Sequence, residues 1–490
     1  MKILPWLICI TLIVLACNSK QASSSESGSD LVKITKPNII YILADDLGYG
    51  DLSCYGQTRF STPNIDKLAR EGMVFTQHYS GSTVCAPSRS TLMTGLHTGH
   101  TFIRGNKEVR PEGQFPLADS INTLPEALQK AGYVTGAFGK WGLGFPGSEG
   151  DPNNQGFGEF FGYNCQRLGH HYYPYYLWHN QDSVVLEENE GYNKGTYAPE
   201  LIHEKTLDFI EENKDRPFFL FVPTIIPHAE IAAPEGVLKK YRGKYPPEVS
   251  YEGTDSGEDY RNGPYESQKE AHAGFVAMVD ILDRQVGDIT KKIEDLGLTE
   301  KTLIVFTSDN GPHREGGADP EYFDSNGPLK GFKRDLYEGG IRVPMIARWK
   351  GTIGEETRSD HISAMWDIFS TFAEIAKAPL PEETDGISML PTLLGKKEEQ
   401  KKHEYLYWEF HEKGGRIAVR KGDWKAVRYN VSKDPNAPIE LYNLKNDLGE
   451  EKDVANIHPE IVEEMADIMQ KARVPSRVFN FKQSTYLKSK

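Results

Sequence analysis

Apolar runs alternate along this chain with segments whose apolar residues recur at helical spacing. The run NIIYIL at 38–43 is continuously apolar and rich in β-branched side chains, which indicates a buried strand. The segment at 62–72 instead places Ile65, Leu68 and Ala69 on one face and predicts a helix, with Pro63 in its first turn. A strand is therefore followed by a helix at the start of this region.

The same alternation returns several times further along the chain. Apolar runs predict more strands, at 73–75, 133–138, 218–222 and 302–306. Helical spacing predicts more helices, at 123–132, 199–213 and about 268–296. Strands that alternate with helices form a mostly parallel sheet with helices on both faces. We therefore expect a large α/β domain over residues 37–395.

Two long stretches inside this domain have no regular apolar pattern, at 142–197 and 229–266. The first is rich in glycine and aromatic residues and contains HHYYPYYLWH at 170–179. Loops of this length in a compact domain usually carry function. Two interpretations stay open, because the aromatic side chains suit both a deep pocket that stacks on sugar rings and loops that pack on each other.

The pattern changes at 396–402, where the charged sequence KKEEQKK follows the α/β region. Short alternating runs then predict antiparallel strands, at 404–410, 416–419, 424–427 and 440–444. An amphipathic pattern at 459–473 predicts one final helix. We expect residues 396–490 to form a smaller α+β subdomain, an antiparallel sheet with one helix.

The first residues, MKILPWLICITLIVLAC at 1–17, have the pattern of a signal peptide and are too short for a membrane span. Their end resembles a bacterial lipoprotein cleavage site with Cys17 as the lipidated residue, although Leu15 leaves ordinary cleavage open. A Ser-rich tether follows at 18–36. We expect export to the periplasm or the bacterial envelope, with a lipid anchor as the only contact with the membrane.

The net charge and the cysteine content exclude some classes of protein. A net charge of −14 over 490 residues argues against nucleic-acid binding, but a local cationic site can still bind an anionic substrate. Cys54, Cys85 and Cys165 are the cysteines of the folded body, too few for a disulfide scaffold. Buried thiols at Cys54 and Cys165 are favoured over a disulfide between them.

One short stretch, SGSTVCAPSRSTLMTG at 80–95, combines a reactive residue with the start of a helix. Pro87 fits the first turn of a helix, which puts Cys85 at or just before its N-terminus. The helix N-terminus, with Arg89 one turn on, is expected to bind an oxyanion and to lower the pKa of the Cys85 thiol. The alternative is a buried structural cysteine on an ordinary helix.

Polar residues follow several predicted strands at the point where each strand ends. Asp45 and Asp46 follow the first, and Asp309 and Asn310 follow a later one. Ligands of parallel sheets bind at the carboxyl ends of the strands. Four oxygen donors of this kind suit Ca²⁺ or Mg²⁺, so the sequence predicts a divalent-cation site at this edge.

Cationic side chains near the same edge are candidates for binding an anion. For each of them the alternative interpretation is an ordinary solvated charge on the protein surface. The candidates are Arg89, Lys140, His228 and Lys333. Lys333 lies in a basic stretch in which Lys330 and Arg334 compete for the same role.

Together these motifs resemble those of the type I sulfatases of the alkaline phosphatase superfamily. The matching motifs are NIIYILADD at 38–46, TPNID at 62–66, CAPSRSTLMTG at 85–95, GKW at 139–141, SDNG at 308–311 and EGGIRVP at 338–344. The resemblance covers about residues 37–490, including LYNLKNDLGE at 441–450. It implies an alkaline phosphatase-like fold and the hydrolysis of sulfate esters.

The resemblance also implies a mechanism. A formylglycine-generating enzyme would oxidise Cys85 to formylglycine, whose hydrate attacks sulfur with one hydroxyl and expels sulfate with the other. Ca²⁺, rather than Mg²⁺, would be held by residue 85 with Asp45, Asp46, Asp309 and Asn310. Arg89 would activate the attacking hydroxyl, Lys140 would bind sulfate, and His228 and Lys333 would bind sulfate and protonate the leaving oxygen.

One position departs from the family pattern. The family often has Gly-Lys-Trp-His-Leu-Gly, whereas residues 139–144 read GKWGLG, so an imidazole is missing at Gly142. This leaves open which base assists sulfate release. His313 is the first candidate for that place, and His170 and His171 are further catalytic or substrate-contacting candidates.

We therefore predict an exported sulfatase that acts on a sugar of a sulfated glycan. Two rivals stay open: a phosphate or phosphonate ester hydrolase of the same fold, and a surface glycan-binding protein that has lost its activity.

Overall fold

The computed structural model describes Met1 and residues 36–110 and 112–481. The expected signal peptide at 1–17, the lipidation site Cys17 and the tether at 18–36 lie almost wholly outside the described residues. From Lys36 onward the chain clusters into one unit.

A large mixed sheet forms the centre of this unit, with the strand order β10-β2-β9-β8-β1-β7-β3-β4-β5-β6 and with β11 beside β2. Its strands are β1 (Asn38–Ala44), β2 (Met73–Tyr79), β3 (Val134–Lys140), β4 (Glu159–Tyr163), β5 (Tyr176–His179), β6 (Asp182–Val185), β7 (Phe218–Pro223), β8 (Thr302–Ser308), β9 (Arg342–Arg348), β10 (Thr357–Ser359) and β11 (Ser363–Ala364). The pairs of β9 with β2 and β8, and of β5 with β4 and β6, are antiparallel. The other pairs are parallel, which confirms the expected mostly parallel sheet.

The central strand β1 is buried on both faces, which explains its continuous apolar sequence. Ile40 and Ile42 join a core formed with α1 (Pro63–Arg70), α4 (Ala198–Glu212) and α6 (Ala271–Asp295). Tyr41 points the other way, and its ring centroid lies 5.9 Å from that of Phe372 in α9 (Asp367–Ala376). Alternate residues of one strand therefore hold both helical layers.

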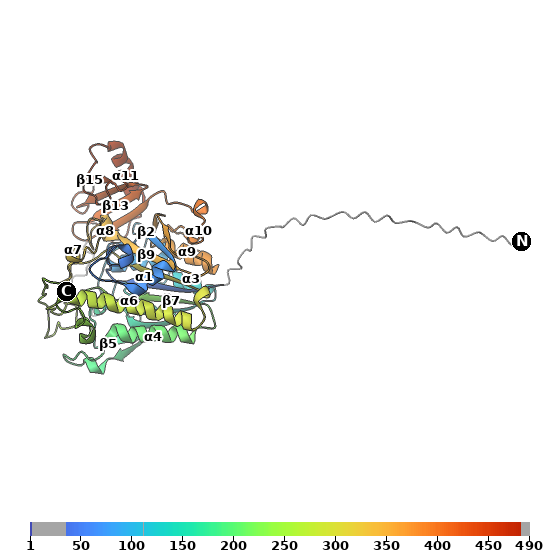
Figure 1. The fold of residues 1–490 in the computed structure, drawn as a ribbon. Helices are drawn as coiled ribbons and strands as arrows, with labels where there is room; N and C mark the ends of the chain where they lie inside the picture. The colour runs from blue at the N-terminus through green and yellow to red at the C-terminus, as the bar shows by residue number, and fades with distance from the viewer. Residues whose placement is uncertain (2–35, 111, 482–490) are drawn as a thin grey trace. The chain divides into compact units, whose positions relative to one another are not determined.

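Helices cover both faces of the sheet, as the sequence predicts. On one face α4 and α6 run side by side (Figure 1), joined by the Arg284–Glu200 ion pair. On the other face α9 packs with α2 (Cys85–Thr94) and α3 (Leu124–Lys130). The remaining helices of this region are the short α5 (Glu235–Leu238), α7 (Pro320–Phe323), α8 (Glu338–Ile341) and α10 (Leu390–Leu393).

The stretch at 142–197 is more regular than its sequence suggests. It contains β4, β5 and β6, which extend the sheet beyond β3. These strands have four or five residues each, and β6 is largely exposed. Because strands this short at a sheet edge carry little apolar periodicity, the sequence pattern did not predict them.

A second sheet follows near the C-terminus, shown in orange and red in Figure 1. Its antiparallel strands are β12 (Leu406–Phe410), β13 (Arg416–Lys421), β14 (Trp424–Tyr429) and β15 (Ile439–Asn443). The final helix α11 (Pro459–Lys471) covers one face through Met465 and Met469. The other face packs against the large sheet through Trp408 and Tyr79, whose ring centroids lie 5.3 Å apart. The predicted elements are confirmed, and a domain boundary at residue 396 stays a prediction.

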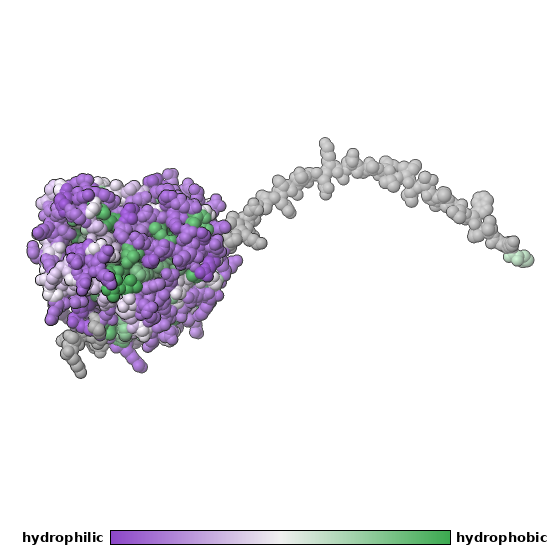
Figure 2. Space-filling model, turned by 90° about the horizontal axis from the view of Figure 1, so that it is seen from below, coloured by the Kyte–Doolittle hydropathy of each residue, from purple (hydrophilic) through white to green (hydrophobic). Residues whose placement is uncertain are grey.

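The face of the molecule in Figure 2 is mostly hydrophilic, with small apolar patches. Among the described residues, no helix is long and apolar enough to cross a membrane. Cys54, Cys85 and Cys165 are free thiols, so Cys54 and Cys165 form no disulfide. Cys165 is buried as favoured above, whereas Cys54 is half-buried.

Candidate active site

Two neighbouring strand ends bring the four predicted oxygen donors together. β1 and β8 pair in parallel up to Ala44 and Ser308, so Asp45 and Asp46 emerge beside Asp309 and Asn310. The Asp46 N–H donates to Asp309 Oδ1 at 3.1 Å, and Asn310 Nδ2 donates to Asp46 Oδ1 at 2.6 Å. Asp46 has a φ of 64°, a conformation that is uncommon outside glycine and recurs at functional sites.

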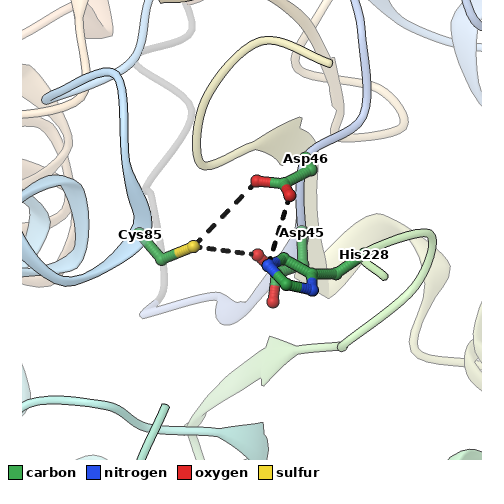
Figure 3. A group of neighbouring side chains, drawn as sticks. All are labelled: Asp45, Asp46, Cys85 and His228. Atoms are coloured by element: carbon green, nitrogen blue, oxygen red, sulfur yellow. Dashed lines mark hydrogen bonds and ion pairs between the residues drawn. The ribbon is translucent and has the colours of Figure 1, made fainter. Parts of the chain in front are cut away.

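Cys85 is the first residue of α2 and faces these carboxylates (Figure 3). Its Sγ lies 3.2 Å from Asp45 Oδ1 and 4.0 Å from Asp46 Oδ1. Burial, together with the charges of Asp309 and Asp45, raises the pKa of the thiol well above its ordinary value. The expected lowering of this pKa is therefore wrong, because desolvation and two carboxylates outweigh the helix N-terminus and the nearby cations.

Each buried carboxylate has its own cation. Lys140 Nζ at the end of β3 lies 2.6 Å from Asp45, Lys333 Nζ lies 2.7 Å from Asp46, and Arg89 Nη2 lies 3.0 Å from Asp309. The competitors of Lys333 have other partners: Lys330 donates to the Glu450 carbonyl, and Arg334 pairs with Glu315. The structure thus brings three of the predicted anion-binding cations to the predicted cation site.

The charges around these groups shift their proton affinities. Although burial opposes ionisation, Lys140, His228 and Arg89 hold the pKa of Asp45 well below its usual range. Burial and the Asp45 charge raise the pKa of Asp309 to about 7. Asp46 holds the pKa of Lys333 above its ordinary value despite burial.

His228 lies between the carboxylates and a stack of imidazoles. Its Nε2 is 3.0 Å from Lys333 Nζ and 3.3 Å from Asp46 Oδ2. Its ring stacks on His170 with 4.7 Å between centroids and on His313 with 5.5 Å. Burial and the charge of Lys333 hold the pKa of His228 well below its ordinary value, which favours the neutral ring.

The other predicted histidines have different surroundings. His170 lines the cavity above Cys85, and burial and His228 lower its pKa. His313 lies behind His228; its Nε2 contacts the Pro227 carbonyl at 3.2 Å, and its Nδ1 accepts from the Glu315 N–H at 3.2 Å. Although burial opposes it, the Glu315 carboxylate raises the pKa of His313.

His171 is buried and is not part of the lining of the cavity above Cys85. Its Nδ1 lies 3.3 Å from Glu230 Oε2, and its Nε2 accepts the Gly263 N–H at 3.0 Å. Both ring nitrogens are therefore used within the protein, and this geometry gives His171 a role in holding a loop.

The donor set fits a hard divalent cation. Asp45, Asp46 and Asp309 supply carboxylate oxygens, and Asn310 Oδ1 is buried without a hydrogen-bond partner among the described residues. One ligand atom each from Asp45, Asp46, Cys85 and His228 lies within 4.8 Å of the others. A buried amide oxygen without a partner is costly in a folded protein and is satisfied when it ligates a cation.

A cavity of about 420 Å³ lies above Cys85 and is lined mainly by polar side chains. Most of its lining carries no sequence motif: Asn106, Glu108, Arg110, Gln114, Gln166, Arg167, Asp259 and Tyr265. Arg334, the predicted competitor of Lys333, lines it as well. Arg167 Nη1 pairs with Glu108 Oε1 at 2.8 Å. The cavity is large enough for a small organic ligand, and its floor contains Cys85, His228 and Lys333.

Comparison with protein families identifies this arrangement. The profile of the Sulfatase family matches residues 37–378, and the profile described as N-sulphoglucosamine sulphohydrolase, C-terminal, matches residues 330–474. The chain belongs to the sulfatase family. It is a sulfuric ester hydrolase with the alkaline phosphatase-like fold predicted from its motifs.

This sulfatase is 29% identical to N-acetylgalactosamine-6-O-sulfatase of Bacteroides thetaiotaomicron, over 96% of this chain and 99% of the relative. It is 32% identical to arylsulfatase A of Homo sapiens, over 90% and 89% of the two chains. Among solved structures, Ps i-CgsB in complex with k-i-k-neocarrahexaose gives a TM-score of 0.72 at 28% identity, over 89% and 92% of the two chains.

Proposed function

We propose that this sulfatase hydrolyses an O-sulfate ester on a sugar of a sulfated glycan, with residue 85 at the reacting centre. The observation that carries the proposal is the position of Cys85 on the floor of the cavity, in reach of both Asp45 and Lys140. An ester placed above Cys85 would meet cations that stabilise its negative charge.

The donor set described above fits a hard divalent cation held by Asp45, Asp46, Asp309 and Asn310. We propose Ca²⁺, the ion that the family resemblance implies, with Mg²⁺ as the alternative. Such a cation supplies Lewis-acid polarisation of oxygen ligands. We propose that Cys85 is matured to formylglycine by a formylglycine-generating enzyme, which replaces a thiol of raised pKa with hydroxyl chemistry.

The surrounding side chains would bind the ester and move protons. Lys140 and Lys333 carry positive charge into the floor of the site, where a sulfuryl group needs it. Arg89 holds Asp309 and donates to the Lys140 carbonyl, so it fixes the geometry of that floor. Lys333 and His228 share a contact of 3.0 Å, and Lys333 is the group that would protonate the leaving oxygen.

A carbohydrate substrate is supported by the relatives. Their names include N-acetylgalactosamine-6-O-sulfatase, and a structural neighbour binds neocarrahexaose. An exported enzyme, anchored by a lipid at Cys17 or released into the periplasm, would meet such glycans outside the cytoplasm. N-acetylgalactosamine 6-sulfate is therefore the first substrate to test.

The test measures sulfate release from a panel of sulfated mono- and oligosaccharides by the mature protein, with Cys85→Ser as the inactive control. We expect release from at least one sugar and none from the control. Matched nitrophenyl sulfate and phosphate esters test the rival activity. A higher kcat/KM for the phosphate ester would refute the sulfatase assignment of this site, and an unmodified Cys85 in protein from the native host would favour an inactive glycan-binding protein.

A further inference from the structure

The wall of the cavity above Cys85 contains an amide nitrogen that has no hydrogen-bond partner among the described residues. Gln166 is 7% exposed and lines this cavity. Its Nε2 is buried and has no hydrogen-bond partner in the described part of the chain. Native proteins contain few such groups, and each one suggests a missing partner.

The register of the sheet explains how Gln166 reaches this position. The pairing of β3 with β4 continues past both strands, because Trp141 N–H donates to the Tyr163 carbonyl at 2.9 Å and Gly142 N–H to the Asn164 carbonyl at 3.0 Å. Gln166 follows two residues later and lies against Gly142. A Cβ on residue 142 would come within 2.0 Å of Gln166 Nε2, and Gly142 has a φ of +79°. The glycine therefore provides the space that the Gln166 side chain fills.

Other amides line the same cavity. Gln114 is 3% exposed, and Asn106 Oδ1 accepts the Ala86 N–H at 3.2 Å in the first turn of α2, which holds Asn106 close to Cys85. Amides are uncharged and carry both donors and acceptors, as hydroxyl groups do. The sulfuryl group is anionic and suits Lys140 and Lys333, so the amides are left for the neutral part of a substrate.

We propose that Gln166 binds a hydroxyl group of the sugar ring that carries the sulfate ester, and so contributes to substrate specificity. This inference rests on the proposed function for the identity of its ligand as a sulfated sugar. A buried site built to hydrogen-bond a hydroxyl discriminates against the analogue without it, because the amide is then left unpaired.

The test uses binding, so that it does not depend on turnover. In the Cys85→Ser background, calorimetry measures the Kd of N-acetylgalactosamine 6-sulfate and of its monodeoxy analogues. We expect one analogue to bind about tenfold or more weakly than the parent sugar. With Gln166→Met, which keeps the side-chain length but removes both polar atoms, the parent should bind as weakly as that analogue.

The matched control is Gln470→Met, an exposed glutamine on α11 outside the cavity, which should keep the full preference for the parent sugar. If the protein that keeps Gln166 bound the parent sugar and all of its monodeoxy analogues equally well, the proposal would be overturned. No variant at position 166 would be needed for that conclusion. A preference that survives Gln166→Met would overturn it as well. If Gln166→Met does not fold, Gln166→Leu is measured in the same way.

Failure of the proposed function would appear in a different experiment. It would be seen as a mature protein that releases no sulfate from any sugar of the panel, whatever the residue at position 166. Binding of the parent sugar with a hydroxyl preference that depends on Gln166 would still support this inference in that case.

Discussion

Lys333 Nζ lies 2.7 Å from the Asp46 carboxylate, and both side chains are buried. The contact joins the loop before α8 to the end of β1. It brings an ammonium group, whose pKa is held above its ordinary value, to the floor of the cavity that contains Cys85.

Replacement of Lys333 should therefore remove activity. Lys333→Met is expected to lower kcat/KM for the best sugar sulfate by about 10²- to 10³-fold, because one preorganised charge at the reacting centre is lost. Lys330→Met is the matched control, since Lys330 binds the Glu450 carbonyl outside the cavity. The control should lower the thermal unfolding midpoint and leave kcat/KM within about threefold. Equal activity losses in the two variants would contradict the assigned role.

Binding of Ca²⁺ should stabilise the folded protein, because its ligands converge in the native state only. We expect the thermal midpoint to rise with added Ca²⁺ and to fall with a chelator. When Ca²⁺ is at a hundred times its Kd, the free energy of unfolding should rise by about 3 kcal/mol. Asn310→Ala should remove most of this shift, since the unpartnered Oδ1 is lost. A midpoint that does not respond to Ca²⁺ or Mg²⁺ would exclude the proposed cation site.

Cys85 should be converted in protein made with a formylglycine-generating enzyme and remain a thiol without one. Peptide mass spectrometry over residues 80–95 measures the conversion. Activity is expected to follow the converted fraction, because burial and the carboxylates disfavour the Cys85 thiolate. Full activity from unconverted protein would show that the thiol itself suffices.

His313 contacts the Pro227 carbonyl and stacks on His228, so it should act by holding His228 in place. His313→Gln is expected to lower kcat by about tenfold and to change substrate affinity much less. Steady-state kinetics with the best substrate separate the two effects. An unchanged kcat would leave His313 without a part in the reaction.

Asp51 should make stability fall as the pH rises. Burial raises the pKa of this carboxyl to about 7 from an ordinary 3.8, although hydrogen bonds from Ser325 and the Gly48 N–H oppose the shift. The folded state therefore binds more protons than the unfolded state between these values, and stability contributed by the neutral acid is lost as the pH rises through about 7.

The isosteric change Asp51→Asn removes this titration. Denaturant unfolding should find the variant more stable than the wild type by about 2–4 kcal/mol at a pH well above 7, with a smaller difference at about pH 5. The same pH dependence in both proteins would show that another group causes it.

Much of the fold could be predicted because the central strands are buried on both faces. Their apolar runs, such as 38–43, carry the signal within a few residues. Strands β4–β6 were not predicted, because they are short and because β5 and β6 are partly exposed. They join the sheet only through the pairing of β4 with β3, which is a long-range contact.

The ligand edge could also be predicted, since parallel strands place their carboxyl ends together. This rule predicted that Asp45 and Asp309 lie at one site, and the parallel pairing of β1 with β8 places them there. The choice among Lys330, Lys333 and Arg334 could not be made from the sequence, because neighbours along a chain point in different directions and only packing selects one.

The sequence by itself determined the chemistry that is available: an oxidisable cysteine at a helix start, oxygen donors at strand ends, and a glycine at position 142. Only the tertiary structure decided how that chemistry is tuned. The raised pKa of Cys85 and the unpartnered amide of Gln166 both depend on burial and on neighbours far away in the chain. Desolvation and hydrogen bonding are properties of the packed environment, so no local pattern of residues encodes them.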